Sequence, residues 1–167
     1  MSLIPDTAVF QKSLAALPLA KYEPGETILA AGSKTGLLLI LNKGTVAIAK
    51  NGIEVAKVTE PGAVFGELSA LLDQPHTADV RAVEASQFHV ANAETLLGKN
   101  PVALLYVAAV LARRLDAANQ TMIELKSQIL AGQPRSVIEK TVEKLETLLG
   151  DSGANLAYAG YPYDPYA

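Results

Sequence analysis

The spacing of apolar residues divides the chain into a strand-rich part and a helical part. Between Lys21 and Val90, short apolar runs of strand length are separated by glycine-containing turns, a texture that is typical of a sandwich or a small barrel. A short amphipathic helix that Pro18 ends precedes this region. The clearest predicted strands are residues 26–31, 37–42, 45–50, 54–58 and 78–90.

After Val90 the apolar residues take helical spacing. Asn92 is suited to cap a short helix that Gly98 ends, and Pro101 favours the first turn of a long helix that runs to about Ala131. Apolar residues recur in the long helix at alternating intervals of four and three, which predicts a seam of the coiled-coil type. The seam residues are Leu111, Leu115, Ala118, Met122, Leu125 and Ile129.

The two halves of this long helix have different predicted partners. The N-terminal half is almost wholly apolar from Leu104 to Leu111 and is expected to pack on the strands. A helix of about 45 Å is longer than one small β domain can cover. We therefore predict that the C-terminal half forms a homodimer through residues 111–129. The alternative is that the whole seam packs on its own β domain.

Two further segments follow. Gly132-Gln133-Pro134 interrupts the helical pattern, and Ser136 with Glu139 forms a capping-box pattern that opens a second helix, ended by Gly150. Its apolar positions are Val137, Ile138, Val142, Leu145, Leu148 and Leu149. The tyrosine- and proline-rich remainder is interpreted as a tail, with a docking role as the alternative. We therefore divide the chain into a domain of residues 1–131, an extra helix within 132–150 and a tail of 151–167.

Composition narrows the classes of function. The chain has 167 residues, of which 50% are apolar, and a formal net charge of −3, so the basic surface typical of a nucleic-acid-binding protein is absent. It contains no cysteine. The longest apolar stretch, residues 102–112, is shorter than the roughly 20 residues of a membrane span. We expect a cytoplasmic chain with no nucleic-acid or membrane partner.

Residues 61–77 carry the candidate chemistry. Gly66 allows backbone to approach a ligand closely. Leu68, Leu71 and Leu72 have helical spacing, so one face of a short helix can be buried. The first amide groups of that helix have no partner within it and suit an anion.

Two kinds of side chain in this segment could contact a ligand. Glu67 would accept a hydrogen bond from a sugar hydroxyl, and His76 with Thr77 would face a phosphate. The structural alternative is a packing corner in which Glu67 is a solvated carboxylate, favoured by the helix dipole.

This arrangement closely resembles the phosphate-binding cassette of cyclic-nucleotide-binding domains, the β-roll modules of bacterial transcription regulators and cAMP-dependent kinases. The resemblance extends over roughly residues 10–128. His76 occupies the position of the family's phosphate-binding arginine, and we expect residues 132–167 to contain no counterpart of the helix-turn-helix domain of the bacterial regulators. The matching residues are Phe65, Gly66, Glu67, Leu68, Leu71, Leu72, Pro75, Thr77 and Ala78.

The resemblance implies an α+β fold: an antiparallel double-stranded β-helix, or β-roll, flanked by helices and followed by a long dimerisation-type helix. It also implies a regulatory module that binds cAMP or cGMP, changes its helix packing on binding and acts on an unknown protein effector. The implied ligand-binding residues are Phe65, Gly66, Glu67, Leu68, His76, Thr77 and Asn119, with Leu41 and Val58 as candidate apolar walls.

Two other functions are alternatives to this one. A degenerate β-roll could serve as a dimeric protein-interaction subunit that no longer binds nucleotide. An enzyme is not expected, because the chain has only two histidines, His76 and His89, to hold a metal and has no nucleophile-elbow, P-loop or dinucleotide-binding motif.

Overall fold

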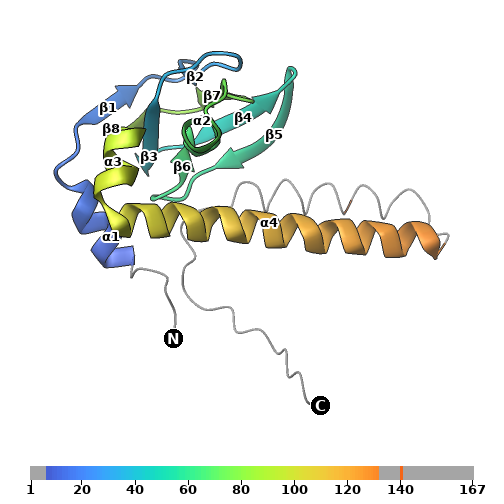
Figure 1. The fold of residues 1–167 in the computed structure, drawn as a ribbon. Helices are drawn as coiled ribbons and strands as arrows, with labels where there is room; N and C mark the ends of the chain where they lie inside the picture. Colours follow the sequence, from blue (N-terminus) through green and yellow to red (C-terminus); the bar gives the residue numbers. More distant parts are fainter. Residues whose placement is uncertain (1–6, 132–139, 141–167) are drawn as a thin grey trace.

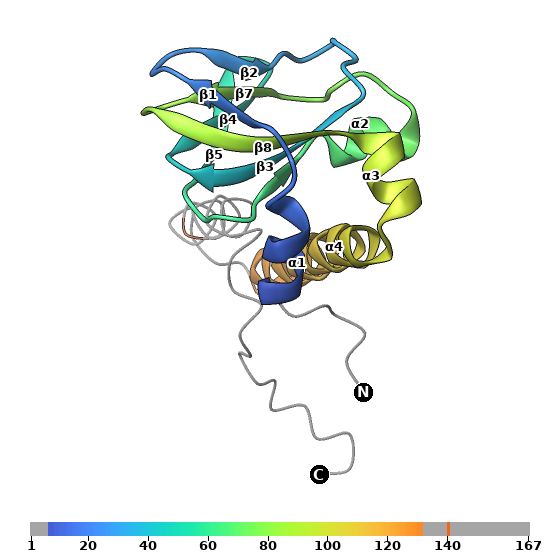
Figure 2. The ribbon, with the colours of Figure 1, turned by 90° about the vertical axis from the view of Figure 1, so that its left-hand side faces the viewer.

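The structure, a computed structural model, describes residues 7–131 and residue 140. Two four-stranded antiparallel sheets face each other, and helices lie at one end and along one side of them (Figures 1 and 2). The strands are β1 (Leu19–Tyr22), β2 (Thr27–Leu29), β3 (Leu37–Lys43), β4 (Val46–Lys50), β5 (Ile53–Val58), β6 (Val64–Phe65), β7 (Asp79–Ala82) and β8 (Ser86–Asn92). The helices are α1 (Thr7–Leu14), α2 (Glu67–Leu72), α3 (Ala93–Lys99) and α4 (Pro101–Leu130).

The strand order confirms the predicted β-roll. One sheet has the order β1-β8-β3-β6 and the other β2-β7-β4-β5, so strands distant in sequence lie side by side. Leu39 pairs with Val90 in the first sheet, and Ile48 pairs with Val80 in the second. The apolar cluster between the sheets includes Leu41, Val58 and Phe88, all essentially inaccessible to solvent.

Three details differ from the predicted strands. The run 78–90 forms two strands, β7 and β8, because the chain turns at residues 83–85 between them. The short strands β1 and β6 were not predicted. Each is only four or two residues long, which is too short for an alternating pattern to stand out.

A second apolar cluster fixes α4 against the β-roll. The Phe10 ring of α1 stacks on the Tyr106 ring of α4 with centroids 3.6 Å apart, and the Tyr106 hydroxyl donates to the Gly62 carbonyl. The Asn92 side chain caps α3, as predicted, by accepting from the amide of Thr95. Pro101 opens α4, also as predicted. The N-terminal half of α4 thereby becomes a rigid wall beside the sheets.

The C-terminal half of α4 continues beyond the two sheets (Figure 1). Leu115, Met122 and Ile129 of the predicted seam are each more than 60% exposed there. The second helix and the tyrosine-rich tail predicted from the sequence lie outside the described residues, apart from Lys140.

Among the described residues, no single helix combines the length and the hydropathy of a membrane span. The pair α3 and α4 meets both requirements only when taken together, and these helices are bent by 106° relative to each other.

Candidate ligand-binding site

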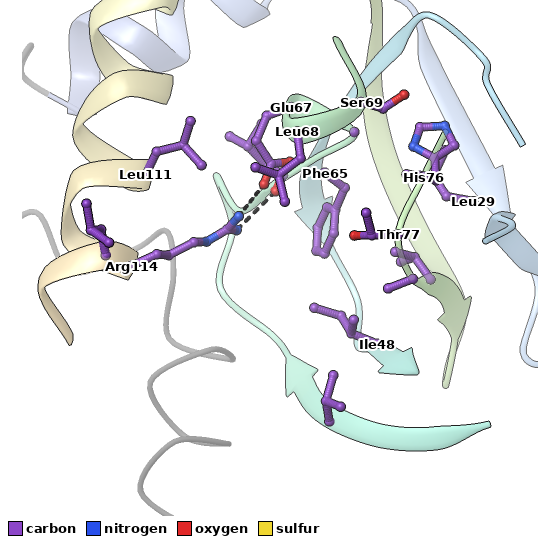
Figure 3. Close-up of a pocket in the computed structure, with 16 residues that line it drawn as sticks. Leu29, Ile48, Phe65, Glu67, Leu68, Ser69, His76, Thr77, Leu111 and Arg114 are labelled. Atoms are coloured by element: carbon purple, nitrogen blue, oxygen red, sulfur yellow. Dashed lines mark hydrogen bonds and ion pairs between the residues drawn. The ribbon is translucent and has the colours of Figure 1, made fainter. Parts of the chain in front are cut away.

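A cavity of about 440 Å³ lies between α2, the inner strands and α4 (Figure 3). Its polar side chains come from α2, from the segment before β7 and from α4, and its apolar side chains come mainly from strands. The lining residues are Leu29, Ile48, Val55, Val64, Phe65, Gly66, Glu67, Leu68, Ser69, His76, Thr77, Ala78, Val80, Leu111, Arg114 and Leu115.

Gly66 sets the direction in which α2 leaves β6. Its φ of 88° lies in the left-handed region, and a Cβ placed there would be 2.4 Å from the Leu37 carbonyl oxygen. Only glycine meets both conditions without strain. The first backbone bond of α2 runs from the Ala70 amide to the Gly66 carbonyl. The amides of residues 67–69 therefore have no partner inside the helix.

Glu67 is buried at the cavity wall and bound by an arginine from α4. The residue is only 4% exposed. Arg114 donates through Nη1 to Glu67 Oε1 and through Nη2 to the Val64 carbonyl, the latter over 3.2 Å (Figure 3). Because this carboxylate has left bulk water, the guanidinium offsets a desolvation penalty that would otherwise be several kcal/mol. The ion pair also connects α4 directly to the cassette.

One oxygen of Glu67 remains available to a ligand. Arg114 contacts Oε1, whereas Oε2 has no hydrogen bond to any described residue. A carboxylate oxygen accepts but cannot donate, so the group that completes this site must be a donor such as a hydroxyl.

His76 lines the same cavity but is tied to the loop between β2 and β3. Its Nε2 lies 2.9 Å from Thr35 Oγ1. Its amide donates to the Ser33 carbonyl, and its own carbonyl accepts from the Gly32 amide. Burial lowers the pKa of the imidazole, and the negative charge of Glu67 opposes this only in part. The ring is therefore mainly neutral at pH 7.

Thr77 completes the polar side of the cavity. The Thr77 side chain is exposed and lies beside Phe65 in the close-up (Figure 3). Its hydroxyl has no hydrogen bond to a described residue, so it is free to donate to, or accept from, a ligand.

The sequence of this region identifies its family. Residues 19–98 match the family described as the cyclic nucleotide-binding domain. These residues belong to that family.

The cyclic nucleotide-binding domain of this chain is similar to parts of longer proteins. It is 35% identical over 68 residues to a cGMP-dependent protein kinase of Plasmodium berghei, covering 41% of this chain and 8% of the kinase. The chain is 33% identical over 106 residues to glutaminase 2 of Bradyrhizobium diazoefficiens, covering 59% of this chain and 17% of that protein. The chain thus spans less than a fifth of the length of either relative.

A solved structure has the same fold. The catabolite activator protein of Thermus thermophilus aligns with a TM-score of 0.60 and 20% identity, over 86% of this chain and 82% of that one. At this level of identity the likeness shows the fold alone.

Six of the seven ligand-binding residues predicted from the sequence line the cavity. They are Phe65, Gly66, Glu67, Leu68, His76 and Thr77. The seventh, Asn119, is exposed on α4 and is not among the lining residues. The candidate walls Leu41 and Val58 are buried between the sheets instead, because their side chains point into the core cluster.

The predicted burial of the leucine face of α2 is wrong. Leu68, Leu71 and Leu72 are 41%, 45% and 62% exposed, whereas Glu67 and Ser69 are the buried residues of this helix. A helix of six residues can bury only one of its sides. In α2 the buried side is the one that carries Glu67, which forms the ion pair with Arg114.

Sequence reasoning missed Arg114 and Thr35 as partners of the site. Arg114 ends a long apolar stretch, and a charge at the edge of a buried helix face was the one available signal. Thr35 gave no signal, because its contact with His76 spans 41 positions. Within the described part of the chain, no group of three or more histidine, aspartate or glutamate side chains is placed to hold a metal ion.

Proposed function

We propose that this chain binds a cyclic nucleotide, cAMP or cGMP, in the cavity between α2 and α4, and that it acts as a regulatory module in the cytoplasm rather than as an enzyme. The observation that carries the proposal is that the cassette residues of the cyclic nucleotide-binding domain converge on one cavity with polar groups at one side and apolar strands at the other.

The ribose would be held by Glu67. Its Oε2 can accept a hydrogen bond from a 2′-hydroxyl, while Arg114 holds the other oxygen and so orients the carboxylate. Hydrogen bonds to a charged group contribute about 1.5–3 kcal/mol.

The cyclic phosphate would be held without an arginine from the cassette. The amides at the start of α2 and the Thr77 hydroxyl supply donors. His76 supplies a ring that a bound anion would help to protonate. A neutral imidazole is a weaker partner for phosphate than a bidentate guanidinium, so we expect lower affinity than a family member with the arginine would have.

Ligand binding would reach α4 through the cavity wall. Leu111, Arg114 and Leu115 all line the cavity, so a nucleotide would contact the helix directly and could shift its packing. Leu115, Met122 and Ile129 of the 111–129 seam are exposed on the same helix and suit a homodimer, whereas Ala118 and Leu125 of the seam are only partly exposed. A change at the cavity would then alter the dimer that is presented to an effector protein.

A thermal-shift experiment on the full chain tests the proposal. A ligand that binds only the folded state increases the free energy of unfolding, by about 2.7 kcal/mol at a hundredfold excess over Kd. The midpoint of thermal unfolding rises as a result. We expect cAMP or cGMP to raise it in proportion to the logarithm of concentration, and 5′-AMP and 5′-GMP, which lack the cyclic phosphodiester, to do so much less. An unmoved midpoint with millimolar cyclic nucleotide would instead favour the degenerate interaction subunit.

A further inference from the structure

A stripe of reduced exposure follows the C-terminal half of α4. Thr121, in the middle of the stripe, is 1% exposed. The residues between the members of the stripe are exposed. Its spacing of i, i+1, i+4, i+7, i+8 and i+11 is that of one helix face. The members are Ala117, Ala118, Thr121, Glu124, Leu125 and Gln128.

The described elements do not account for this burial. The α4 residues in the apolar cluster with α1 and α3 end at Leu111, and the C-terminal half of the helix extends past both sheets (Figure 1). Among the described residues, the Thr121 hydroxyl donates a hydrogen bond only to its own helix, at the Ala117 carbonyl. Because Thr121 is buried within a single protomer, the covering residues belong to the same chain.

Reach distinguishes the two ends of the chain. The N-terminal residues 1–6 precede α1, whose Phe10 ring stacks on Tyr106 of α4. Tyr106 lies about 22 Å from Thr121 along the axis of α4. Six fully extended residues span roughly 20 Å, so they cannot cover a stripe of three turns. A helix of residues 136–149 would be about 21 Å long and, running back from Leu130, would cover α4 to about residue 116.

The sequence and one described residue support that second candidate. Lys140 is helical and exposed. At helical spacing, Lys140 falls on the side opposite the apolar positions of this segment. These positions are Val137, Ile138, Val142, Leu145, Leu148 and Leu149.

We propose that residues 136–149 dock as an antiparallel amphipathic helix on the stripe centred on Thr121, which makes the C-terminal half of α4 one arm of a helical hairpin. The exposed residues Leu115, Met122 and Ile129 lie about 100° around the helix from Thr121 and remain available to a second copy. The partner of the stripe is thus a segment of the same chain, and the docking does not depend on nucleotide binding.

Thiol reactivity tests the docking directly, because the full chain contains no cysteine. Thr121→Cys places a thiol on the stripe, and Ser127→Cys places the control thiol on the exposed side of the same helix. We expect the thiol at position 121 to react with a disulfide reagent at least about tenfold more slowly than the one at 127, since exchange requires local opening. Equal rates in the full chain would overturn the proposal.

Charge substitutions identify the covering segment. Leu145→Asp with Leu148→Asp should raise the reactivity at position 121 to that at 127, whereas Lys140→Glu, on the polar side, should leave it low. Persistent protection in the double variant would overturn the proposal, and so would protection that rises with protein concentration, which would assign the cover to a second copy. Circular dichroism and a cooperative thermal transition establish that the β-roll of each variant remains folded.

Discussion

The substitution His76→Arg should increase the affinity for cyclic nucleotide. The imidazole lines a cavity of about 440 Å³, and its Cε1 lies 3.7 Å from the point where a Cβ on Gly66 would be. The ring thus lies next to the start of α2, and a longer side chain at position 76 can extend from there into the cavity. A guanidinium there adds a permanent charge and two parallel donors for the phosphate. This contribution is about 1.5–3 kcal/mol, or roughly a tenfold to hundredfold lower Kd.

The same substitution has a separate effect on stability. It removes the hydrogen bond between His76 Nε2 and Thr35 Oγ1, which contributes about 0.5–1.5 kcal/mol to folding. Affinity must therefore be measured well below the thermal midpoint of each variant.

Isothermal titration with cAMP and cGMP compares the wild type, His76→Arg and the control His76→Gln, which keeps a neutral polar side chain. We expect tighter binding only for the arginine variant. If its Kd equals that of the wild type, or if glutamine gives the same gain, position 76 does not face the phosphate and the reasoning fails.

Three further changes follow from the same geometry. Gly66→Ala should destabilise the fold by about 1–3 kcal/mol in urea denaturation, because Gly66 has a positive φ and a close backbone neighbour. The control Gly98→Ala should stabilise the fold slightly, because Gly98 is helical and has open space around it. Equal effects of the two substitutions would contradict the argument. Burial lowers the pKa of His76 in the folded state. The free energy of unfolding should therefore fall as pH drops below about 6.5, where the unfolded state binds the proton more readily. If the His76→Gln variant shows the same dependence of stability on pH, His76 is not the cause. Met122→Glu should convert the proposed homodimer to a monomer in analytical ultracentrifugation, whereas Ser127→Glu should not. A wild type that is monomeric at all concentrations would refute the predicted dimer seam.

The fold was predictable because its signals are local. Glycine-punctuated apolar runs marked most of the strands, and Asn92 and Pro101 marked the starts of α3 and α4. The short strands β1 and β6 were missed because pairing with distant strands, rather than their own pattern, stabilises them. The leucines of α2 were misassigned because periodicity shows which residues share a face but not which face is buried.

The candidate site also contains some features that a local sequence pattern predicts and others that depend on distant residues. Glu67, His76 and Thr77 are close together in sequence, so one motif was enough to group them. Their orientation depends on contacts that no local pattern contains: Arg114 reaches Glu67 across 47 positions, and Thr35 reaches His76 across 41. Asn119 is exposed on α4 and does not line the cavity, so its assignment to the site stays a prediction.

The most direct test of the central claim uses the wild-type chain and changes only the ligand. Titration calorimetry with cAMP and cGMP, each beside its 2′-deoxy analogue, measures whether Glu67 accepts the ribose hydroxyl. The account predicts saturable binding of at least one cyclic nucleotide, with one ligand per chain. The 2′-deoxy form of that nucleotide should bind with a Kd that is higher by about tenfold or more. No binding of either nucleotide, or equal affinity for the deoxy form, would contradict it.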